Sequence, residues 1–513
     1  MNYADLFRVT LPETVLEIAA LLVLVIDLAF LRKAALQTRE MAAAILGVIG
    51  CGVAVAMLPM QAGIGVAYPG GTELMLSAGG YTTIAQVGIL ILTVLTLFLV
   101  IGSEFTQHVG EYVAVVLMAA TGGLLIAGAQ DLLVIFVGLE LLSLGLYILT
   151  AFAKKSDKSA EGAMKYYLFG GMSAAFLLFG FSYLYGLTGS TNLHEIMRGL
   201  YSGNVMSASP LLYVALVMVA AGLGFKVAAV PFHLWAPDTY EGAPAPAAAF
   251  IASVSKVASF ALLLGIGTAA AHAFGDPNQV AMVTVHSGPT SRFLGFAGPW
   301  SVIVAIIAVA SMVFGNLAAL AQTSVRRLLA YSAIAHAGYI LLALAYFSHS
   351  TASTYAVLYY ILTYGLTTVG AFGAVSVVER AGGSDRMDAF LGLYKRNGLL
   401  AAIMMVLFLS LAGIPPLVGF WAKFNLFAAV LGVNRGVVPF TIVALAVSMS
   451  AVSLYYYLQV LKRVFVMPAA NETPVKGNPI TIGVLVVIAL VVVVLGCLPG
   501  LLQTWMTSFY AGM

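Results

Sequence analysis

The chain has 513 residues, of which 62% are hydrophobic and only 8% charged. Soluble domains carry about 25% charged residues, so this composition excludes a soluble globular protein and indicates a chain embedded in lipid. The formal net charge of +3 favours no particular partner, and the chain has neither a Walker loop nor a GxGxxG fingerprint. We therefore expect no nucleotide, metal or nucleic acid to bind to it.

Hydropathy predicts about fourteen membrane helices, each close to the roughly 20 residues that cross a bilayer as helix. We expect them at 12–31, 41–59, 81–102, 112–129, 132–153, 162–187, 210–232, 245–272, 299–321, 327–347, 353–379, 399–429, 438–465 and 480–503. The first span lacks an Ala-x-Ala cleavage site, so we interpret it as a retained helix and not as a signal peptide. The predicted fold class is an all-α membrane protein.

Three local features complete this outline. The connection between the fourth and fifth spans, near Ala129–Asp131, is so short that it predicts a tight helical hairpin, and we expect a small interfacial helix at 192–203. Cys51 and Cys497 lie far apart inside apolar segments. They predict two buried, inert thiols, and neither a disulfide nor a metal site.

The distribution of basic residues predicts the orientation, because cytoplasmic loops of membrane proteins are enriched in Lys and Arg. With the N-terminus placed outside, fifteen of the 23 Lys and Arg fall on the cytoplasmic side and four fall outside. Both termini are therefore predicted to be extracytoplasmic. The other four basic residues lie within predicted spans: Lys165, Lys226, Lys256 and Lys423.

A faint internal repeat relates the two halves of the chain. Tyr147-Ile-Leu-Thr-Ala151 in the fifth span is similar to Tyr339-Ile-Leu-Leu-Ala343 in the tenth, and each is followed by a loop, a Tyr-Tyr pair and a Gly-rich helix. We interpret these halves as two five-helix units, and an odd number of spans per unit inverts the second copy. Inverted repeats with interrupted helices are typical of transporters. The predicted parts are a three-helix segment at 1–110, repeats at 111–272 and 299–465, and a C-terminal loop and helix at 466–513.

Four lysines inside membrane spans require an explanation. A lysine at the membrane centre costs about 2.5–3.5 kcal/mol on insertion scales, so four without compensation cost on the order of 10 kcal/mol. Glu140 lies well inside a span of the first repeat, and we predict that it forms an ion pair with Lys226. Burial favours a neutral lysine and a nearby carboxylate favours a charged one, so a lysine balanced between them can exchange a proton near neutral pH.

Helix breaks lie beside two of these lysines. Pro231 interrupts the seventh span after Lys226, and Pro415-Pro416 interrupt the twelfth span before Lys423. Proline frees backbone carbonyls, which a membrane protein tolerates where the backbone lines a cavity. The breaks therefore predict a hydrated polar row at mid-membrane depth. Its predicted members are Lys226, His233, Lys256, His336 and Lys423.

Structural roles compete with this interpretation. Lys165 could pair with Glu161 one turn away, or extend to the cytoplasmic surface. His336 could hydrogen-bond a carbonyl, and the pair formed by Glu140 could be inert. The lysines of the eighth and twelfth spans are harder to explain in this way, because their own spans offer no nearby acid.

Four stretches carry a resemblance to a known family. They read GLGFKVAAVPFHLWAPDTYEGAPAPAAAFIASVSKVA at 222–258, FGNLAALAQTSVRRLLAYSAIAHAGYILLAL at 314–344, LSLAGIPPLVGFWAKF at 409–424 and SLYYYLQVLKRVF at 453–465. With the first as the most specific, they resemble subunit N of bacterial respiratory complex I, the NADH-quinone oxidoreductase. The WAPDTYEGAP run favours subunit N over the sister subunits L and M.

The resemblance implies about fourteen helices in two inverted five-helix repeats, with helices 7 and 12 broken. It implies a proton pathway made of Glu140, Lys165, Lys226, His233, Lys256, His336 and Lys423. It also implies a bacterial inner membrane, and partner subunits M, K, J and A in the membrane arm. NADH, FMN, iron–sulfur clusters and quinone would belong to partner subunits.

We therefore expect a proton-translocating membrane-arm subunit with no redox centre of its own. A charge change at or near Glu140, coupled to quinone reduction elsewhere in the complex, would release the proton of Lys226 into the row and toward Lys423. One alternative is a subunit of a multi-subunit cation/proton antiporter, which would use the same lysines. Another is a structural spacer whose ion pairs hold the arm together.

Overall fold

The structure is a computed structural model that describes residues 7–61, 65–67, 74–202, 210–275, 297–347, 351–433, 436–469 and 473–511. The N-terminal half contains α2 (Leu11–Val25), η1 (Ile26–Phe30), α3 (Leu36–Met57), η2 (Leu58–Gln61), β1 (Gly65–Ala67), β2 (Leu74–Ser77), α4 (Tyr81–Val100), α5 (Val109–Gly128), α6 (Leu132–Thr150), α7 (Asp157–Thr188), α8 (Leu193–Ser202), α9 (Pro210–Lys226), α10 (Ala236–Gly242), α11 (Ala245–Ala252) and α12 (Val254–Gly275). The C-terminal half contains α14 (Ala297–Leu320), α15 (Val325–Ala345), α16 (Thr351–Gly382), η5 (Met387–Phe390), α17 (Leu393–Arg396), α18 (Gly398–Ala412), α19 (Val418–Val433), α20 (Val437–Phe465), α21 (Pro479–Cys497) and α22 (Gly500–Ala511).

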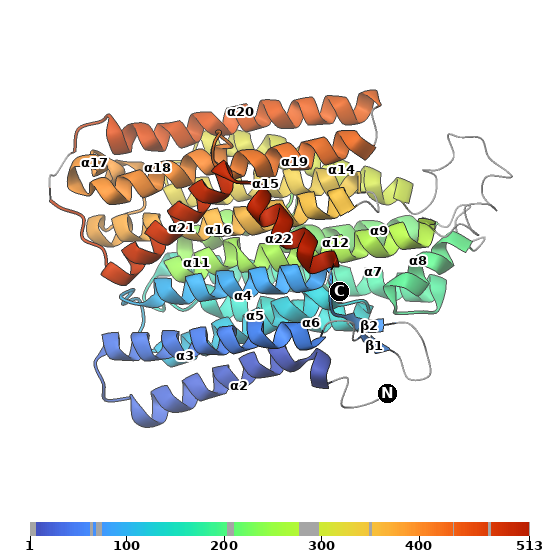
Figure 1. Ribbon diagram of the computed structural model, residues 1–513, viewed down its shortest axis with the longest axis horizontal. Coiled ribbons are helices and arrows are strands. Elements are labelled where there is room, and N and C mark those ends of the chain that lie inside the picture. Colours follow the sequence, from blue (N-terminus) through green and yellow to red (C-terminus); the bar gives the residue numbers. More distant parts are fainter. Residues whose placement is uncertain are drawn as a thin grey trace.

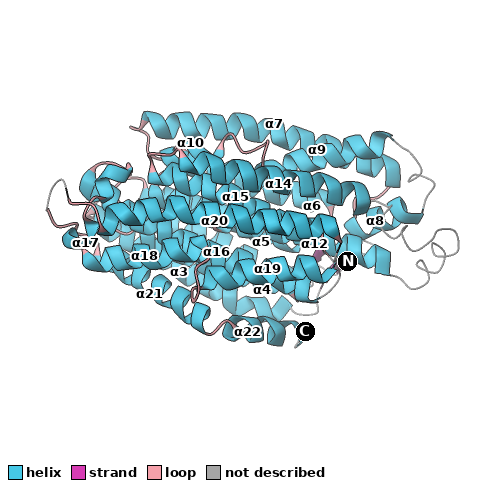
Figure 2. Cartoon of the chain, turned by 90° about the horizontal axis from the view of Figure 1, so that it is seen from above, coloured by secondary structure: helices cyan, strands magenta, loops and turns pink. Residues whose placement is uncertain are grey.

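Most of these helices run side by side along the long axis of the molecule (Figure 1). The N-terminal helices α2 and α3 form one side of the bundle and α20 forms the opposite side. Seen from above, α7 and α9 lie along one edge and α21 and α22 along the other (Figure 2). In the described residues, eleven helices are long and apolar enough to cross a membrane. The predicted all-α membrane fold is confirmed.

Side-chain caps set the start of several membrane helices. Asp131 accepts hydrogen bonds from the amides of Leu133 and Val134, at 2.8 and 3.3 Å, at the start of α6. Asn397 accepts from the amide of Leu400 at 3.0 Å at the start of α18. Such caps satisfy amides that a helix leaves unpaired at its first turn. The cap at Asp131 follows α5 after three residues, which confirms the predicted hairpin.

The two predicted helix breaks and the small helix after the sixth span are also confirmed. Residues 227–235 separate α9 from α10, and residues 413–417 separate α18 from α19. The helix α8 occupies the position predicted at 192–203. A third interruption was not predicted: Ser253 separates α11 from α12, with φ −117° and ψ −74°.

Three other features differ from the expectations. Cys497 is exposed, so the prediction of two buried thiols is wrong for this residue and holds for Cys51. The antiparallel pair of β1 and β2 was not foreseen. The last predicted span ends at Cys497, and a separate helix, α22, follows it because Pro499 stands at the turn.

Candidate functional site

The first break is closed by a compact turn. Ala228 has φ 57°, a left-handed conformation, and the amide of Ala229 donates to the carbonyl of Gly224 at 2.8 Å. This bond spans five residues and ends α9 in the manner of a Schellman turn. The indole Nε1 of Trp235 donates to the carbonyl of Phe225 at 3.1 Å, so a side chain from beyond the break satisfies the end of the helix.

Lys226, the last residue of α9, faces α6. Its Nζ lies 4.0 Å from Oε1 of Glu140 and donates to Oγ of Ser143, one turn further along the same helix. Lys226 is buried, and the side chain of Glu140 is 28% exposed. The predicted ion pair is confirmed, and Ser143 extends it to a three-residue group.

The second break has a similar turn but a different cap. Gly413 has φ 87°, and the amide of Ile414 donates to the carbonyl of Leu409 at 3.1 Å. Lys423, on α19, donates from Nζ to the carbonyls of Leu411 and Ala412 at 3.1 and 3.0 Å. A cation at a helix C-terminus is stabilised by these carbonyl dipoles. The lysine itself therefore caps the broken helix.

Lys423 makes two further contacts. Its Nζ lies 2.8 Å from Oγ of Ser450 on α20 and 5.4 Å from the ring centroid of Tyr339 on α15. The hydroxyl of Tyr339 accepts from Nδ2 of Asn316 at 3.1 Å, and Oδ1 of Asn316 accepts from Tyr456 at 3.1 Å. Polar groups from three helices thus surround one buried ammonium group.

Helix α15 connects the lysine of the eighth span to that of the twelfth. Lys256, three residues after the interruption at Ser253, donates to the carbonyl of Ala333 at 2.6 Å. One turn along α15, Nδ1 of His336 lies 2.8 Å from the hydroxyl of Tyr360. Lys256 and Lys423 are both within electrostatic range of His336. The structure therefore brings Lys256, His336 and Lys423 together around one helix.

His233 does not join either group by a hydrogen bond. It lies in the irregular segment after α9, so it does not share a helical face with Lys226. Within the described residues its buried Nδ1 has no hydrogen-bond partner, and its ring meets Phe314 edge-on at 4.7 Å between centroids. In the part of the chain that the structure describes, no hydrogen bond links this histidine to Lys226 or Lys256.

Lys165 lies in an ionic network at the end of the bundle where α7 begins. Its Nζ is 2.6 Å from Glu161 and 2.6 Å from Asp238 of α10, and Asp238 also pairs with Arg327 of α15. Burial raises the pKa of Asp238, but hydrogen bonds from Lys165 and Arg327 outweigh this effect and hold that pKa below its ordinary value. Both the predicted pairing with Glu161 and a second, longer-range pairing are present.

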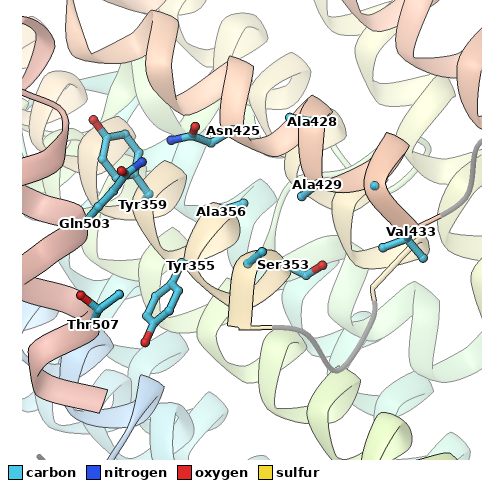
Figure 3. Close-up of a pocket in the computed structure, with 12 residues that line it drawn as sticks. Ser353, Tyr355, Ala356, Tyr359, Asn425, Ala428, Ala429, Val433, Gln503 and Thr507 are labelled. Atoms are coloured by element: carbon cyan, nitrogen blue, oxygen red, sulfur yellow. The ribbon is translucent and has the colours of Figure 1, made fainter. Parts of the chain in front are cut away.

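A cavity of about 590 Å³ opens between α16, α19 and α22 (Figure 3). Its polar lining includes Tyr359, Asn425, Gln503 and Thr507. The hydroxyl of Tyr359 is buried and has no hydrogen-bond partner among the described residues. The cavity thus borders the helix that carries Lys423, two residues before Asn425.

The described residues contain no group of three or more His, Cys, Asp and Glu side chains that could hold a metal ion. The residues that the sequence reasoning missed are neutral: Ser143, Asn316, Tyr360 and Ser450. Ser143 could have been found, because it follows Glu140 by three residues on one helical face. The others approach their partners from distant helices, which spacing along the chain does not reveal.

Comparison with known proteins identifies the family. The family model described as "NADH:quinone oxidoreductase/Mrp antiporter, TM" matches residues 129–286 and 280–451. A subunit N 2 of NADH-quinone oxidoreductase from Acidobacterium capsulatum is 46% identical over 99% of this chain and 99% of its own. The chain belongs to the subunit N family of NADH-quinone oxidoreductases. A subunit N 1 from Roseiflexus castenholzii, 39% identical over 86% of this chain and 81% of its own, belongs to the same family. The resemblance seen in the sequence is confirmed.

Solved structures agree with this membership. A chain of respiratory complex I from Thermus thermophilus with bound aureothin matches 96% of this chain and 98% of its own, with TM-score 0.74 and 32% identity. A chain of the Mrp complex from Dietzia sp. matches with TM-score 0.77 at 21% identity, over 51% of its length, and this likeness concerns the fold alone. The family members are antiporter-like membrane subunits, and this chain has their architecture.

Proposed function

We propose that this chain, as subunit N of a proton-translocating NADH-quinone oxidoreductase, moves H⁺ across a bacterial inner membrane. Quinone reduction elsewhere in the complex drives the movement, and both termini are extracytoplasmic. The proposed proton pathway consists of Glu140, Lys226, His233, Lys256, His336 and Lys423, and Lys165 supports it from outside this row. NADH, FMN, iron–sulfur clusters and quinone bind to partner subunits, and the neighbours in the membrane arm are subunits M, K, J and A.

The observation that carries this proposal is a difference among three buried lysines. Within the part of the chain that the structure describes, the charge of Lys226 is compensated by a carboxylate, and the charges of Lys256 and Lys423 are not. At 4.0 Å, the attraction between Lys226 and Glu140 is roughly 4 kcal/mol at an effective dielectric constant of about 20. This exceeds the insertion cost of about 2.5–3.5 kcal/mol for a lysine at the membrane centre. In the described residues no carboxylate lies within ion-pair distance of Lys256 or Lys423. Neutral oxygens and the ring of Tyr339 surround these two ammonium groups, so in this part of the chain they lack the counterion that Lys226 has.

Glu140 is suited to respond to a charge change in a neighbouring subunit. It is partly exposed on α6, between Val137 and Leu144, which are themselves 61% and 50% exposed. A neighbouring subunit packed on this apolar face can alter the charge beside Glu140. Loss of an attraction of roughly 4 kcal/mol exceeds the about 2.3 kcal/mol needed to move one charge against 100 mV. Lys226 then releases its proton.

The proton passes next to Lys256 and His336 and leaves near Lys423. No direct hydrogen bond joins Lys226 to Lys256 in the described part of the chain, so the transfer between them runs through water and past His233. The cavity beside α19 supports release in this region, because it is open and partly polar. Lys165 acts at a distance from the row, by holding α10 in place through Asp238.

Two observations support the division into inverted repeats at 111–272 and 299–465. The same family model matches the chain twice in succession, at 129–286 and 280–451. The helix breaks in the two halves end in similar turns, with Ala228 and Gly413 in the left-handed conformation. Each unit thus contains one broken helix beside a buried lysine.

The experiment that tests the proposal replaces Lys226 with Ala in the assembled complex. Proton pumping in proteoliposomes should be abolished while the subunits still assemble, and Glu140→Gln should reduce pumping at least about tenfold. Lys462→Ala, at an exposed position on α20, serves as the matched control and should pump normally. Full pumping by the Lys226→Ala complex would refute the role of this lysine.

Two outcomes would favour the alternatives. Isolation of the chain with other antiporter subunits, and without flavin or iron–sulfur subunits, would make it part of a cation/proton antiporter. If Lys226, Lys256 and Lys423 could all be replaced by uncharged polar residues with pumping intact, the chain would be a structural spacer.

A further inference from the structure

A second polar cluster lies outside the pathway, at the end of the bundle where α2 and α4 begin. Several buried side-chain oxygens there have no hydrogen-bond partner among the described residues. They belong to Glu13, Gln61, Thr82, Thr83, Gln86 and Gln130. All six residues are more than nine-tenths buried. No other part of the described chain gathers as many unpaired buried oxygens.

Hydrogen bonds and helical spacing join these residues into one cluster. Nε2 of Gln86 lies 3.5 Å from Oε1 of Glu13, and Thr82 and Thr83 are within one helical turn of Gln86. Gln61 donates to the carbonyl of Val9, one turn before Glu13 on the same segment. Gln130 is tied to the first residue of α4, because its Nε2 lies 3.3 Å from the hydroxyl of Tyr81.

Glu13 has no cationic partner in the described residues. The charged residue near it is Glu17, on the next turn of α2. The helices α3 and α5 pack against α2, but their charged side chains lie at its other end. There, Arg39 binds Asp27 at 2.7 and 2.6 Å, and Glu111 lies 3.0 Å from His108. A buried carboxylate without a partner charge is strongly disfavoured, and such a group becomes neutral instead.

The other members of the cluster indicate how the charge of the Glu13 carboxylate is neutralised. Among the described residues, three glutamine carbonyls are acceptors that lack donors and two threonine hydroxyls lack any partner, and buried polar atoms of this kind are normally satisfied by ordered water. A protonated carboxyl adds one donor to this acceptor-rich site. A metal cation fits less well, because Gln86 directs its amide N–H, a donor, at the carboxylate. The cluster also contains a single carboxylate, which would leave one charge of a divalent cation uncompensated.

We propose that Glu13 is a proton-binding site of the N-terminal three-helix segment, separate from the lysine pathway and held as a carboxylic acid within ordered water. The proton on Glu13 supplies a donor to the surrounding amide oxygens, which have none of their own. Its release leaves a buried anion beside Glu17, so release requires either entry of water or movement of α2 away from α4. The segment therefore stores one proton outside the row.

Infrared spectroscopy of the purified complex tests this proposal without reference to pumping. The spectrum should contain the carbonyl band of a protonated carboxylic acid that disappears in Glu13→Gln and weakens as the pH is raised. Glu17→Gln, an exposed position on the same helix, is the matched control and should retain the band. If Glu13→Gln fails to assemble, Glu13→Asp should shift the band.

Two results would overturn the proposal. One is a spectrum in which neither substitution at position 13 changes any protonated carboxyl band. The other is a band that is present in choline chloride and lost in sodium chloride at the same pH, because the site would then take a metal cation. Because the measurement detects bound protons directly, a failure here leaves the proposed pumping pathway untouched.

Discussion

The two broken helices are built alike but capped differently. Both α9 and α18 end in a left-handed residue followed by proline. In the first half, the indole of Trp235 satisfies the exposed carbonyl of Phe225. In the second half, the ammonium group of Lys423 satisfies the carbonyls of Leu411 and Ala412.

In the first half, one side chain caps the helix end and another exchanges the proton. In the second half, Lys423 does both. An indole carries its N–H at every pH, so the first cap persists whether Lys226 is charged or neutral, and Lys226 is free to face Glu140. The second cap depends on the lysine. When Lys423 loses its proton, the stabilisation of a cation by the helix end is lost as well. Proton release is thus coupled to the geometry of the second break and not to that of the first.

The largest effect is expected at Lys423. Lys423→Met removes both the charge and the donor, so pumping should be abolished, and the free energy of unfolding should fall by about 2–4 kcal/mol because two carbonyls lose their partner. Lys423→Gln keeps an N–H donor without the charge. It should also abolish pumping but recover most of the stability. Pumping in proteoliposomes and the thermal midpoint of the complex measure the two effects.

Lys462→Met, an exposed lysine on α20, is the control for this pair and should change neither quantity. The comparison between the two halves would fail if Lys423→Met were as stable as the wild type, because the lysine would then not act as the cap.

The breaks themselves could be predicted from Pro231 and Pro415-Pro416, because proline removes a hydrogen bond at a known position. The pair of Glu140 and Lys226 could also be predicted, since an acid and a base inside neighbouring spans each need a partner. The caps could not. Trp235 reaches back across an irregular segment of nine residues, whose path depends on tertiary packing and not on local pattern.

The predictions for the histidines illustrate the same limit. A continuous helix would place His233 on the same face as Lys226, seven residues before it, and the break removes that relation. His336 lies inside the regular helix α15, where its position relative to Ala333 and Tyr339 follows from the helical repeat. Within a continuous helix, the spacing of residues along the sequence therefore predicts their relative positions in space. Across an interruption it does not.

A smaller effect is expected from Trp235→Phe, which removes the neutral cap of the first break. The ring of Trp235 stacks on Tyr166 with centroids 4.1 Å apart, and phenylalanine can retain this contact. The free energy of unfolding should fall by about 1–2 kcal/mol, because the buried carbonyl of Phe225 loses its donor. Pumping should persist at a reduced rate, since Lys226 and Glu140 remain.

Trp421→Phe, in the second half, is the matched control substitution. Trp421 donates to the carbonyl of Gly496 at 2.8 Å, at the end of α21 and not at either of the two broken helices α9 and α18. If Trp235→Phe abolished pumping as completely as Lys423→Met, the two caps would be equivalent and the proposed separation of tasks would be wrong.

The smallest effect concerns the ionic network that holds α10, for which the second half has no counterpart among the described residues. Asp238→Asn weakens the bonds to Lys165 and Arg327, and because these side chains are partly exposed the loss should stay below about 1 kcal/mol. The folded pKa of Asp238 lies below its ordinary value, so its contribution to stability is present above the unfolded carboxyl pKa and is lost as the pH falls through the folded pKa.

The thermal midpoints of wild type and Asp238→Asn should therefore differ at neutral pH and converge in acid. Asp157→Asn, exposed at the start of α7, is the control and should show no such convergence. A difference independent of pH would mean that α10 is held by packing, and that its position is as insensitive to charge as the first cap.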